Sequence, residues 1–305
     1  MLVEAAALAT ALPLVPETMF DPMGPVAAEQ KAHMIRVVVL TMIAIVPVLV
    51  GVPLLVWRYR RRPGSKATYS PNWGFNGWLE LAMWGVPVAI IAVLAGALVY
   101  STKLLDPARP IGPEPLKVQA IGLNWKWVFI YPQQGVATID QLVVPVGRPV
   151  ELVMTSDTVM LSPMAAALSG QIYVMPGMIT RQNLQADRTG RTTGRNMMYN
   201  GDGFAGQAFT VEAVPTETFK AWATTAAGST VTLDAAGYAR IAAQGTGAQA
   251  RTMLGLPDGS AAMRMGDPAL FQQVVGRYHK GTAVTAGEQP GTASYGGGDH
   301  DGGAR

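Results

Sequence analysis

The sequence predicts a two-helix transmembrane hairpin, then an all-β Greek-key sandwich, then a small C-terminal helical region. Two long uncharged stretches predict the hairpin. Seven short runs rich in Val, Ile, Thr and aromatic residues, separated by Pro and Gly, predict the sandwich. The apolar fraction of 49% with only 14% charged residues is typical of a membrane protein.

Residues 1–36 precede the first span, and the apolar stretch 1–15 is either a signal-peptide remnant or a frayed apolar N-terminus. The hairpin is predicted over 37–105, with spans at 37–57 and 81–100 that carry no charge. Each span is long enough to cross about 30 Å of hydrocarbon. Pro47, Pro53 and Pro87 lie inside the spans, where neighbouring helices can compensate for the lost hydrogen bonds.

The loop between the spans sets the orientation. From Arg58 to Leu79 it has no acidic residue and contains five basic ones: Arg58, Arg60, Arg61, Arg62 and Lys66. The positive-inside rule therefore predicts a cytoplasmic loop, with both termini and the C-terminal domain in the periplasm. A basic run can also bind nucleic acid. Its place between two spans favours a topological role instead, so no nucleic-acid partner is expected.

Glu80 stands at the start of the second span. Two interpretations remain open for this carboxylate. It pairs with a partner subunit or the arginine cluster, or it is a solvated residue that complements the helix dipole.

The exported domain is predicted over 116–215. Its expected strands are 116–121, 125–131, 137–144, 150–155, 171–175, 179–185 and 208–214. A helical region follows over 216–280, with helices at 218–225, 233–243 and 268–278. Residues 281–305 are rich in Gly and polar residues, which predicts a disordered tail.

The chain has no cysteine, and no histidine between His33 and His279. The exported domain therefore lacks the thiolate and imidazole ligands that copper, zinc and iron–sulfur centres use. It also lacks a Cys nucleophile and a Ser–His pair. We expect no catalytic residue, metal or cofactor in this chain.

Three stretches resemble subunit II of the haem–copper respiratory oxidases, whose exported domain is a cupredoxin-like sandwich. Residues 122–127 (GLNWKW) resemble its aromatic strand, and residues 155–160 (TSDTVM) a second landmark, after which the cytochrome c oxidases carry a histidine copper ligand. Residues 199–210 resemble the stretch that holds the other copper A ligands. The vacated positions are Leu161, Tyr199, Gly201, Gly203, Gln207 and Thr210.

An empty copper A scaffold is typical of the quinol oxidase branch. Residues 132–138 (PQQGVAT), 171–178 (QIYVMPGM) and 270–275 (LFQQVV) resemble subunit II of the cytochrome bo-type ubiquinol oxidases. The likeness runs from about Phe20 to Tyr278. One position departs from it. That subunit typically carries a lipid-bearing Cys six residues before the motif found here at 21–25 (DPMGP), and this chain has Val15 there. We therefore expect the two spans to anchor the protein alone.

The resemblance implies a non-catalytic structural and assembly subunit of a proton-pumping terminal ubiquinol oxidase in the bacterial inner membrane. Haems, copper and ubiquinol are then expected in subunit I. The implied partners are oxidase subunits I, III and IV, membrane lipid, and ubiquinol through subunit I. Cytochrome c is not expected as a partner, because acidic and basic residues nearly balance over 117–215 and predict no acidic docking face.

The resemblance also implies roles for four side chains. Trp125 and Trp127 are expected to pack in the sandwich or against a partner subunit, since without copper an electron-entry role has no acceptor. Tyr199 and Gln207 are expected to fill the vacated pocket and to hydrogen-bond across it. The alternatives are a menaquinol oxidase subunit, a membrane-tethered cupredoxin-like binding or chaperone module, and a copper electron carrier.

Overall fold

The computed structural model describes residues 12–60, 74–257, 259–292 and 294–295. The chain divides into two compact units. One consists of residues 29–106, and the other of residues 1–28 with residues 107–305. Most of the basic loop, including Arg61, Arg62 and Lys66, lies outside the described residues, as do residues 1–11 and 296–305.

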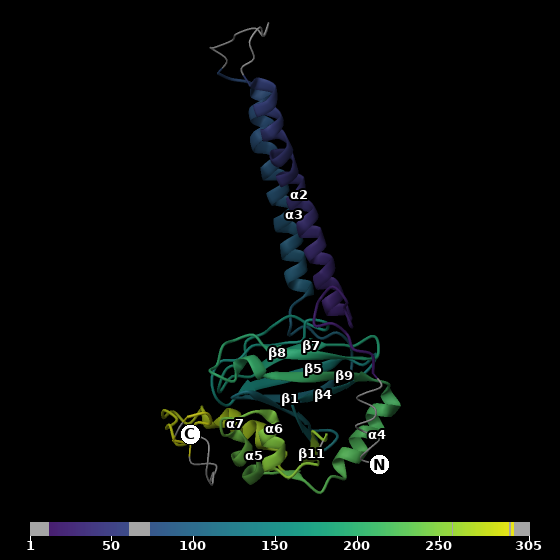
Figure 1. Ribbon diagram of the computed structural model, residues 1–305, viewed down its shortest axis with the longest axis vertical. Coiled ribbons are helices and arrows are strands. Elements are labelled where there is room, and N and C mark those ends of the chain that lie inside the picture. The colour runs from purple at the N-terminus through teal and green to yellow at the C-terminus, as the bar shows by residue number, and fades with distance from the viewer. Residues whose placement is uncertain (1–11, 61–73, 258, 293, 296–305) are drawn as a thin grey trace. The chain divides into compact units, whose positions relative to one another are not determined.

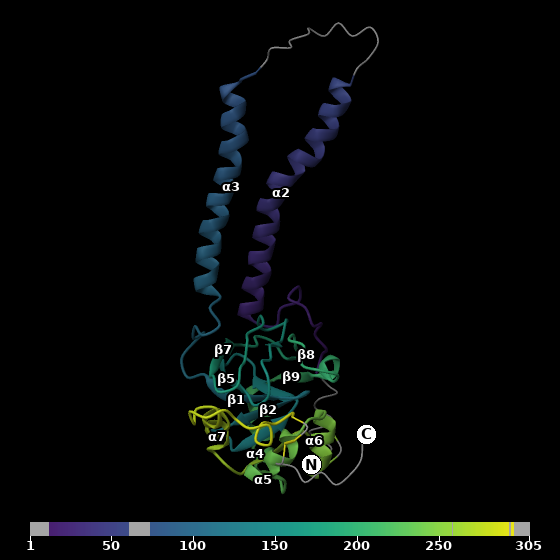
Figure 2. The same ribbon diagram turned by 90° about the vertical axis from the view of Figure 1, so that its left-hand side faces the viewer.

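The first unit is the predicted hairpin of two long helices, α2 (Pro25–Tyr59) and α3 (Gly77–Leu104), which Figure 2 shows. Both helices are long and apolar enough to cross a membrane. The predicted spans lie wholly inside them. Asn76 caps α3, because its side-chain oxygen accepts from the amides of Trp78 and Leu79 at 3.1 and 3.2 Å.

The second unit contains the predicted β-sandwich (Figure 1). One sheet has seven strands in the order β10-β11-β3-β2-β1-β5-β7, and the other has four in the order β4-β9-β8-β6. The strands of the larger sheet are β1 (Leu116–Leu123), β2 (Lys126–Tyr131), β3 (Val136–Ile139), β5 (Val150–Ser156), β7 (Thr180–Leu184), β10 (Thr232–Leu233) and β11 (Ala262–Met265). Those of the smaller sheet are β4 (Gln141–Pro145), β6 (Pro163–Met164), β8 (Gly190–Asn196) and β9 (Ala208–Val214).

The structure of β2 explains why its sequence is apolar without a break from Trp127 to Tyr131. Trp127, Phe129 and Tyr131 point into the core between the two sheets. Val128 and Ile130 point the other way, into a second core under the C-terminal helices. Every residue of β2 is buried, because both faces of the strand are covered.

The strand predictions differ from the structure at several places, and the short strands β6, β10 and β11 were not predicted. The run 137–144 is two strands, because Asp140, with φ of 56°, turns the chain from one sheet into the other. The run 171–175 is not a strand, and only Val174 forms an isolated bridge, with Leu161. Strand β8 was not predicted, since its sequence is rich in Gly and Arg. The side chain of Phe209 fills the place of a Cβ at Gly194.

Four helices follow the last long strand: α4 (Thr216–Ala227), α5 (Ala235–Ala242), α6 (Gly247–Met253) and α7 (Leu270–Arg277). Figure 1 shows α5, α6 and α7 gathered on one side of the sandwich. Their apolar side chains build the second core on the larger sheet, including Tyr238, Ile241, Phe271 and Val274. Helix α6 was not predicted, although Thr246 and Gln249 form a capping box at its start.

The two ends of this unit also contact the sandwich. Val15 is only 2% exposed in the main core, and its amide donates to the carbonyl of Arg191 in β8 at 2.7 Å. The predicted disordered tail begins at 281, but Gln289 donates to the carbonyl of Thr158 at 2.8 Å. At least this part of the predicted tail is therefore held by the domain.

Candidate functional site

The site is built around the buried side chain of Gln207, which follows a 3-10 turn (Phe204–Gly206) and directly precedes β9. Its Nε2 donates to the carbonyl of Leu123 at 3.0 Å. Its Oε1 accepts from the side-chain amides of Asn200 at 2.7 Å and Asn196 at 3.0 Å. The predicted role of Gln207 in filling this space agrees with these contacts.

Asn196 ties the cluster to the neighbouring loops. Its Oδ1 accepts from the amides of Ser162 at 2.9 Å and Met198 at 3.1 Å, while its Nδ2 also reaches the carbonyl of Met198 at 2.6 Å. The three side chains are neutral amides, so the cluster carries no formal charge. Neutral amides joined in this way hold loops together and supply neither a nucleophile nor a proton.

Trp125 covers the cluster. It lies in the turn between β1 and β2 with φ of 69°, so the prediction that it begins the second strand is wrong. Its Nε1 donates to the carbonyl of Asn200 at 3.2 Å. The indole lies so close to Gly203 that a Cβ there would collide with it, and a Cβ at Gly201 would lie 3.6 Å from its Cζ2. Gly201 has φ of 104°, which also favours glycine.

Leu161 and Trp127 close the site from the sandwich side. Both are fully buried in the main core. Each packs on Gly122, where a Cβ would collide with Leu161 and would lie 3.0 Å from Cζ3 of Trp127. The prediction that Trp127 packs in the core therefore agrees with the structure, and Leu161 is an apolar wall.

Three of the predicted residues do not join this cluster. Tyr199 is 71% exposed and packs on Phe204, with ring centroids 5.7 Å apart, so the expectation that it fills a pocket is wrong. Thr210 lies within β9 and its amide donates to the carbonyl of Asp140 at 2.9 Å. Glu80 lies in the other unit, exposed in the first turn of α3.

Two buried charged clusters were missed by the sequence reasoning. In one, Asp157 accepts from Tyr238, Arg277 and Tyr278. Burial raises the pKa of Asp157 to about 6, and Arg277 opposes that rise. No local pattern marked Asp157, because its partners are 81 or more positions away along the chain.

The second cluster contains Lys126 and Asp140. The ammonium of Lys126 donates to the carbonyls of Ala243 at 2.7 Å and Gly245 at 2.9 Å, at the start of the α6 region. Burial lowers the pKa of Lys126 to about 8, and the nearby carboxylate of Asp140 opposes that change. Burial also raises the pKa of Asp140 to about 7. The Asp157 cluster joins α5 and the end of α7 to the end of β5, whereas the Lys126 and Asp140 cluster joins α6 and the loop before it to β2.

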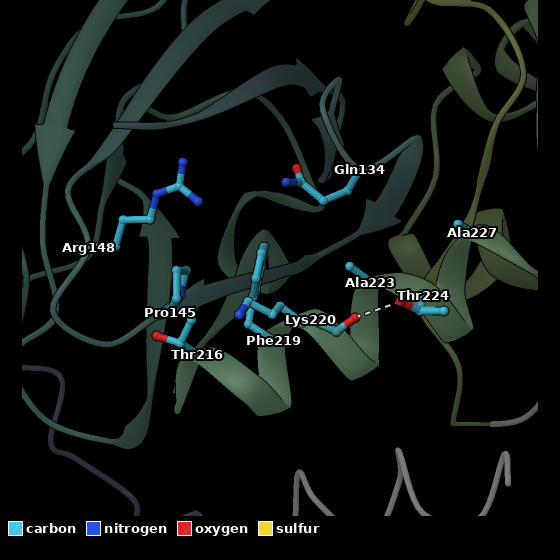
Figure 3. A pocket seen from close by; sticks show the side chains of 9 residues that line it. All are labelled: Gln134, Pro145, Arg148, Thr216, Phe219, Lys220, Ala223, Thr224 and Ala227. Atoms are coloured by element: carbon cyan, nitrogen blue, oxygen red, sulfur yellow. Dashed lines mark hydrogen bonds between the residues drawn. The ribbon is translucent and has the colours of Figure 1, made fainter. Parts of the chain in front are cut away.

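An open groove of about 530 Å³ lies beside α4 (Figure 3). Phe219 and Ala223 line it together with the basic side chains of Arg148 and Lys220. Lys220 pairs with Glu217 at 2.9 Å. None of the predicted site residues lines this groove.

The donor chemistry does not suit a metal. Among the described residues, no group of three or more His, Cys, Asp or Glu side chains is placed to hold an ion. The positions that resemble copper A ligands present an aliphatic chain, an exposed phenol, two glycines, an amide and a hydroxyl. Dinuclear copper requires soft thiolate and imidazole donors, and these residues do not fit it.

The amino-acid sequence of this chain is similar to those of several known proteins. The chain is 37% identical over 227 residues to cytochrome bo(3) ubiquinol oxidase subunit 2 of Pseudomonas putida, which covers 74% of this chain and 72% of that protein. It is 34% identical over 270 residues to ubiquinol oxidase subunit 2 of Acetobacter aceti, covering 87% and 83%. It is 37% identical over 209 residues to quinol oxidase subunit 2 of Bacillus subtilis (strain 168), covering 67% and 65%.

Solved structures were also compared. The periplasmic domain of subunit II of cytochrome oxidase from Bradyrhizobium japonicum matches with a TM-score of 0.36 and 22% identity, covering 37% of this chain and 94% of that one. A chain of a heme-copper terminal oxidase dimer matches with a TM-score of 0.36 and 14% identity, covering 45% and 99%. No protein-family model matches the chain.

The sequence matches extend over most of both chains, at an identity that marks common descent. The match to the Acetobacter aceti protein covers 87% of this chain, so it includes the sandwich and most of the hairpin. The chain therefore belongs to the family of subunit 2 of the ubiquinol oxidases, alongside the cytochrome bo(3) members.

Proposed function

We propose that the chain is the non-catalytic structural and assembly subunit II of a proton-pumping terminal ubiquinol oxidase. The whole enzyme oxidises ubiquinol, reduces oxygen to water and moves protons outward. Its haems, copper and ubiquinol are bound by subunit I. The observation that carries this proposal is the amide cluster around Gln207, at a position where an electron relay would need a metal ligand.

Chemistry explains why this subunit requires no relay. Leu161, Tyr199, Gly201, Gly203, Gln207 and Thr210 are the proposed counterparts of the copper A ligands, and they offer no thiolate or imidazole. The indole of Trp125 also takes up space beside Gly203. Ubiquinol is soluble in the bilayer, so it can deliver electrons inside the membrane without an exported carrier.

A surface of the sandwich supports a docking role. We call it the apolar end: Met160, Tyr173, Met178, Met197 and Tyr199, which are between 37% and 71% exposed. Their loops are tied together, since Leu161 bridges Val174 and the amide of Met197 donates to the carbonyl of Ser162. Large apolar side chains gathered on one surface mark a protein interface. The proposed occupant is the catalytic subunit of the oxidase.

The proposed location is the bacterial inner membrane, with both termini and the sandwich in the periplasm. The basic loop residues support this orientation through the positive-inside rule. Subunits III and IV and membrane lipid are the further proposed partners, with contact to subunits through Glu80 and Trp125. Cytochrome c and nucleic acid are not among the proposed partners.

Purification of the complex tests the proposal. The full chain, tagged at its C-terminus, is purified from membranes in mild detergent, and its partners are identified by mass spectrometry together with haem and quinone assays. We expect a haem-bearing integral subunit, bound ubiquinone and quinol oxidase activity. Isolation of the chain without a haem-bearing subunit would contradict the oxidase role and would favour a tethered binding or chaperone module.

A second candidate is the menaquinol oxidase. The Bacillus subtilis relative, at 37% identity, is named only as a quinol oxidase subunit, so its name is compatible with either quinol. The quinone extracted from the same purified complex separates the two, because the two molecules differ in their ring system and absorbance. A copper electron carrier predicts stoichiometric copper in the isolated chain, which the donor set argues against.

A further inference from the structure

Asp157 connects the C-terminal region to the sandwich. Its side chain is completely buried and follows the last residue of β5. Tyr238 of α5 donates to Oδ2 at 2.7 Å, and Tyr278, just after α7, donates to Oδ1 at 2.9 Å. Nη1 of Arg277 lies 2.9 Å from both carboxylate oxygens.

These three donors compensate the buried charge. A carboxylate without its partners in such an environment is strongly destabilising, whereas a paired and hydrogen-bonded one is tolerated. All four contacts to the two carboxylate oxygens come from donors, two of them from Nη1 of Arg277. The arrangement therefore requires an ionised acceptor, which an amide at position 157 cannot fully replace.

The same C-terminal segment holds two loops of the apolar end. Gln289 donates to the carbonyl of Thr158, next to the loop that carries Met160. The ring of His279 hydrogen-bonds the carbonyl of Gly177, next to Met178. Tyr278 packs closely on Gly177: a Cβ added at Gly177 would lie 2.7 Å from the Cβ of Tyr278. Gly177 has φ of 73°, so the turn that carries Met178 depends on this glycine.

We propose that Asp157 is a positioning residue for docking of the catalytic subunit: through Arg277 and Tyr278 it holds the C-terminal segment against the loops that present Met160 and Met178. This inference rests on the proposed function. It gives the C-terminal helical region a role in shaping the interface with the catalytic subunit.

The test uses the tagged full chain expressed with its oxidase partners. Asp157→Asn removes the negative charge that pairs with Arg277 and turns one of the two accepting oxygens into a donating amide, so we expect the C-terminal segment to detach. We expect recovery of the haem-bearing subunit to fall about tenfold, and amides of 157–162 and 175–179 to exchange hydrogen about tenfold faster, while the amides of β1, β2 and β9 keep their protection. Arg277→Lys keeps the positive charge and is expected to retain the complex, whereas Arg277→Met is expected to lose it.

Asp140→Asn is the matched control. It makes the same chemical change at another buried carboxylate, whose contacts lie at Trp127 and Arg251 and not in the apolar end. We expect Asp140→Asn to keep the haem-bearing subunit. A complex recovered in full with Asp157→Asn, or equal losses with both variants, would overturn the inference.

The failure of this inference is distinguishable from failure of the proposed function. Tyr199→Ser with Met178→Ser removes apolar surface directly and leaves the Asp157 contacts in place. If that variant loses the partner but Asp157→Asn does not, docking at the apolar end stands and the role of Asp157 falls. If neither the wild type nor any variant carries a haem-bearing subunit, the proposed function itself falls.

Discussion

The indole of Trp125 lies against the backbone of Gly203, where it takes up the space that any side chain at position 203 would need. Its Nε1 also donates to the carbonyl of Asn200. One aromatic side chain thus covers the amide cluster and requires a glycine in the facing loop. This close approach gives the first prediction.

Gly203→Ala is expected to destabilise the sandwich, because the added methyl group collides with the ring of Trp125. Forcing extra volume into a packed site typically costs about 1–3 kcal/mol. Urea unfolding of the full chain in detergent, followed by tryptophan fluorescence, measures the change. Gly206→Ala is the control, since nothing lies within 4 Å of a Cβ there. Equal effects of the two substitutions would count against the steric explanation.

Gln207→Leu is expected to lower the free energy of unfolding by about 1–3 kcal/mol for each buried polar group left without a partner. The groups that lose their partner are the carbonyl of Leu123 and the side-chain amide of Asn200, whereas the amide of Asn196 keeps its bond to the carbonyl of Met198. The same unfolding experiment measures the loss. Gln272→Leu, at an exposed position on α7, is the control and should change little. A Gln207→Leu chain as stable as the wild type would show that the amide cluster contributes nothing.

Lys126 predicts a pH dependence of stability. Burial lowers its pKa in the folded chain to about 8, from the usual 10.5. Between these two values the unfolded chain binds the proton and the folded chain does not, so stability from this group increases as pH rises. From pH 7 to about 9.5 the gain is about 2 kcal/mol.

Lys126→Met removes that titration and provides the comparison. Unfolding of both proteins is measured across the same pH range, and the difference between them reports the titration of Lys126 together with its effect on the neighbouring Asp140. The free energy of unfolding of the wild type is expected to rise relative to that of the variant as pH rises. A difference that stays constant with pH would contradict the lowered pKa.

The topology can be tested by single cysteines, because the natural chain has none to remove. Ser65→Cys in the basic loop is expected to react with a membrane-impermeant maleimide only when the cytoplasmic side is opened. Thr230→Cys, at an exposed position after α4, is expected to react in intact cells whose outer membrane is permeabilised. The reverse pattern of labelling would place the sandwich in the cytoplasm.

The hairpin and most strands could be predicted, because the signals for them are local. A span needs about twenty uncharged apolar residues, and these stand together in the sequence. Strands β1, β5 and β9 alternate buried apolar residues with less buried polar ones over part of their length, and β2 is apolar from Trp127 to Tyr131. Their pattern is set by burial on the sheet faces and is visible without knowledge of their partners.

Other elements depend on residues far away in the sequence. Strand β8 reads as a loop, and its Gly194 makes sense only beside the ring of Phe209. The run 137–144 reads as one strand, but Asp140 divides it between two sheets. Tyr199 reads as a pocket-filling residue next to Gln207, yet it lies on the surface against Phe204.

The sequence by itself determined the membrane hairpin, the β-sandwich, the family and the absence of cysteine and histidine from the sandwich, because each depends on which residues are present and on their spacing. Only the tertiary structure decided how that loss is filled: Gln207 joins two asparagines, Trp125 closes over Gly203, and Asp157 gathers three donors from the C-terminal helices. Hydrogen bonds and steric contacts between distant segments leave no periodic signal along a chain, so the fold must be seen before they can be found.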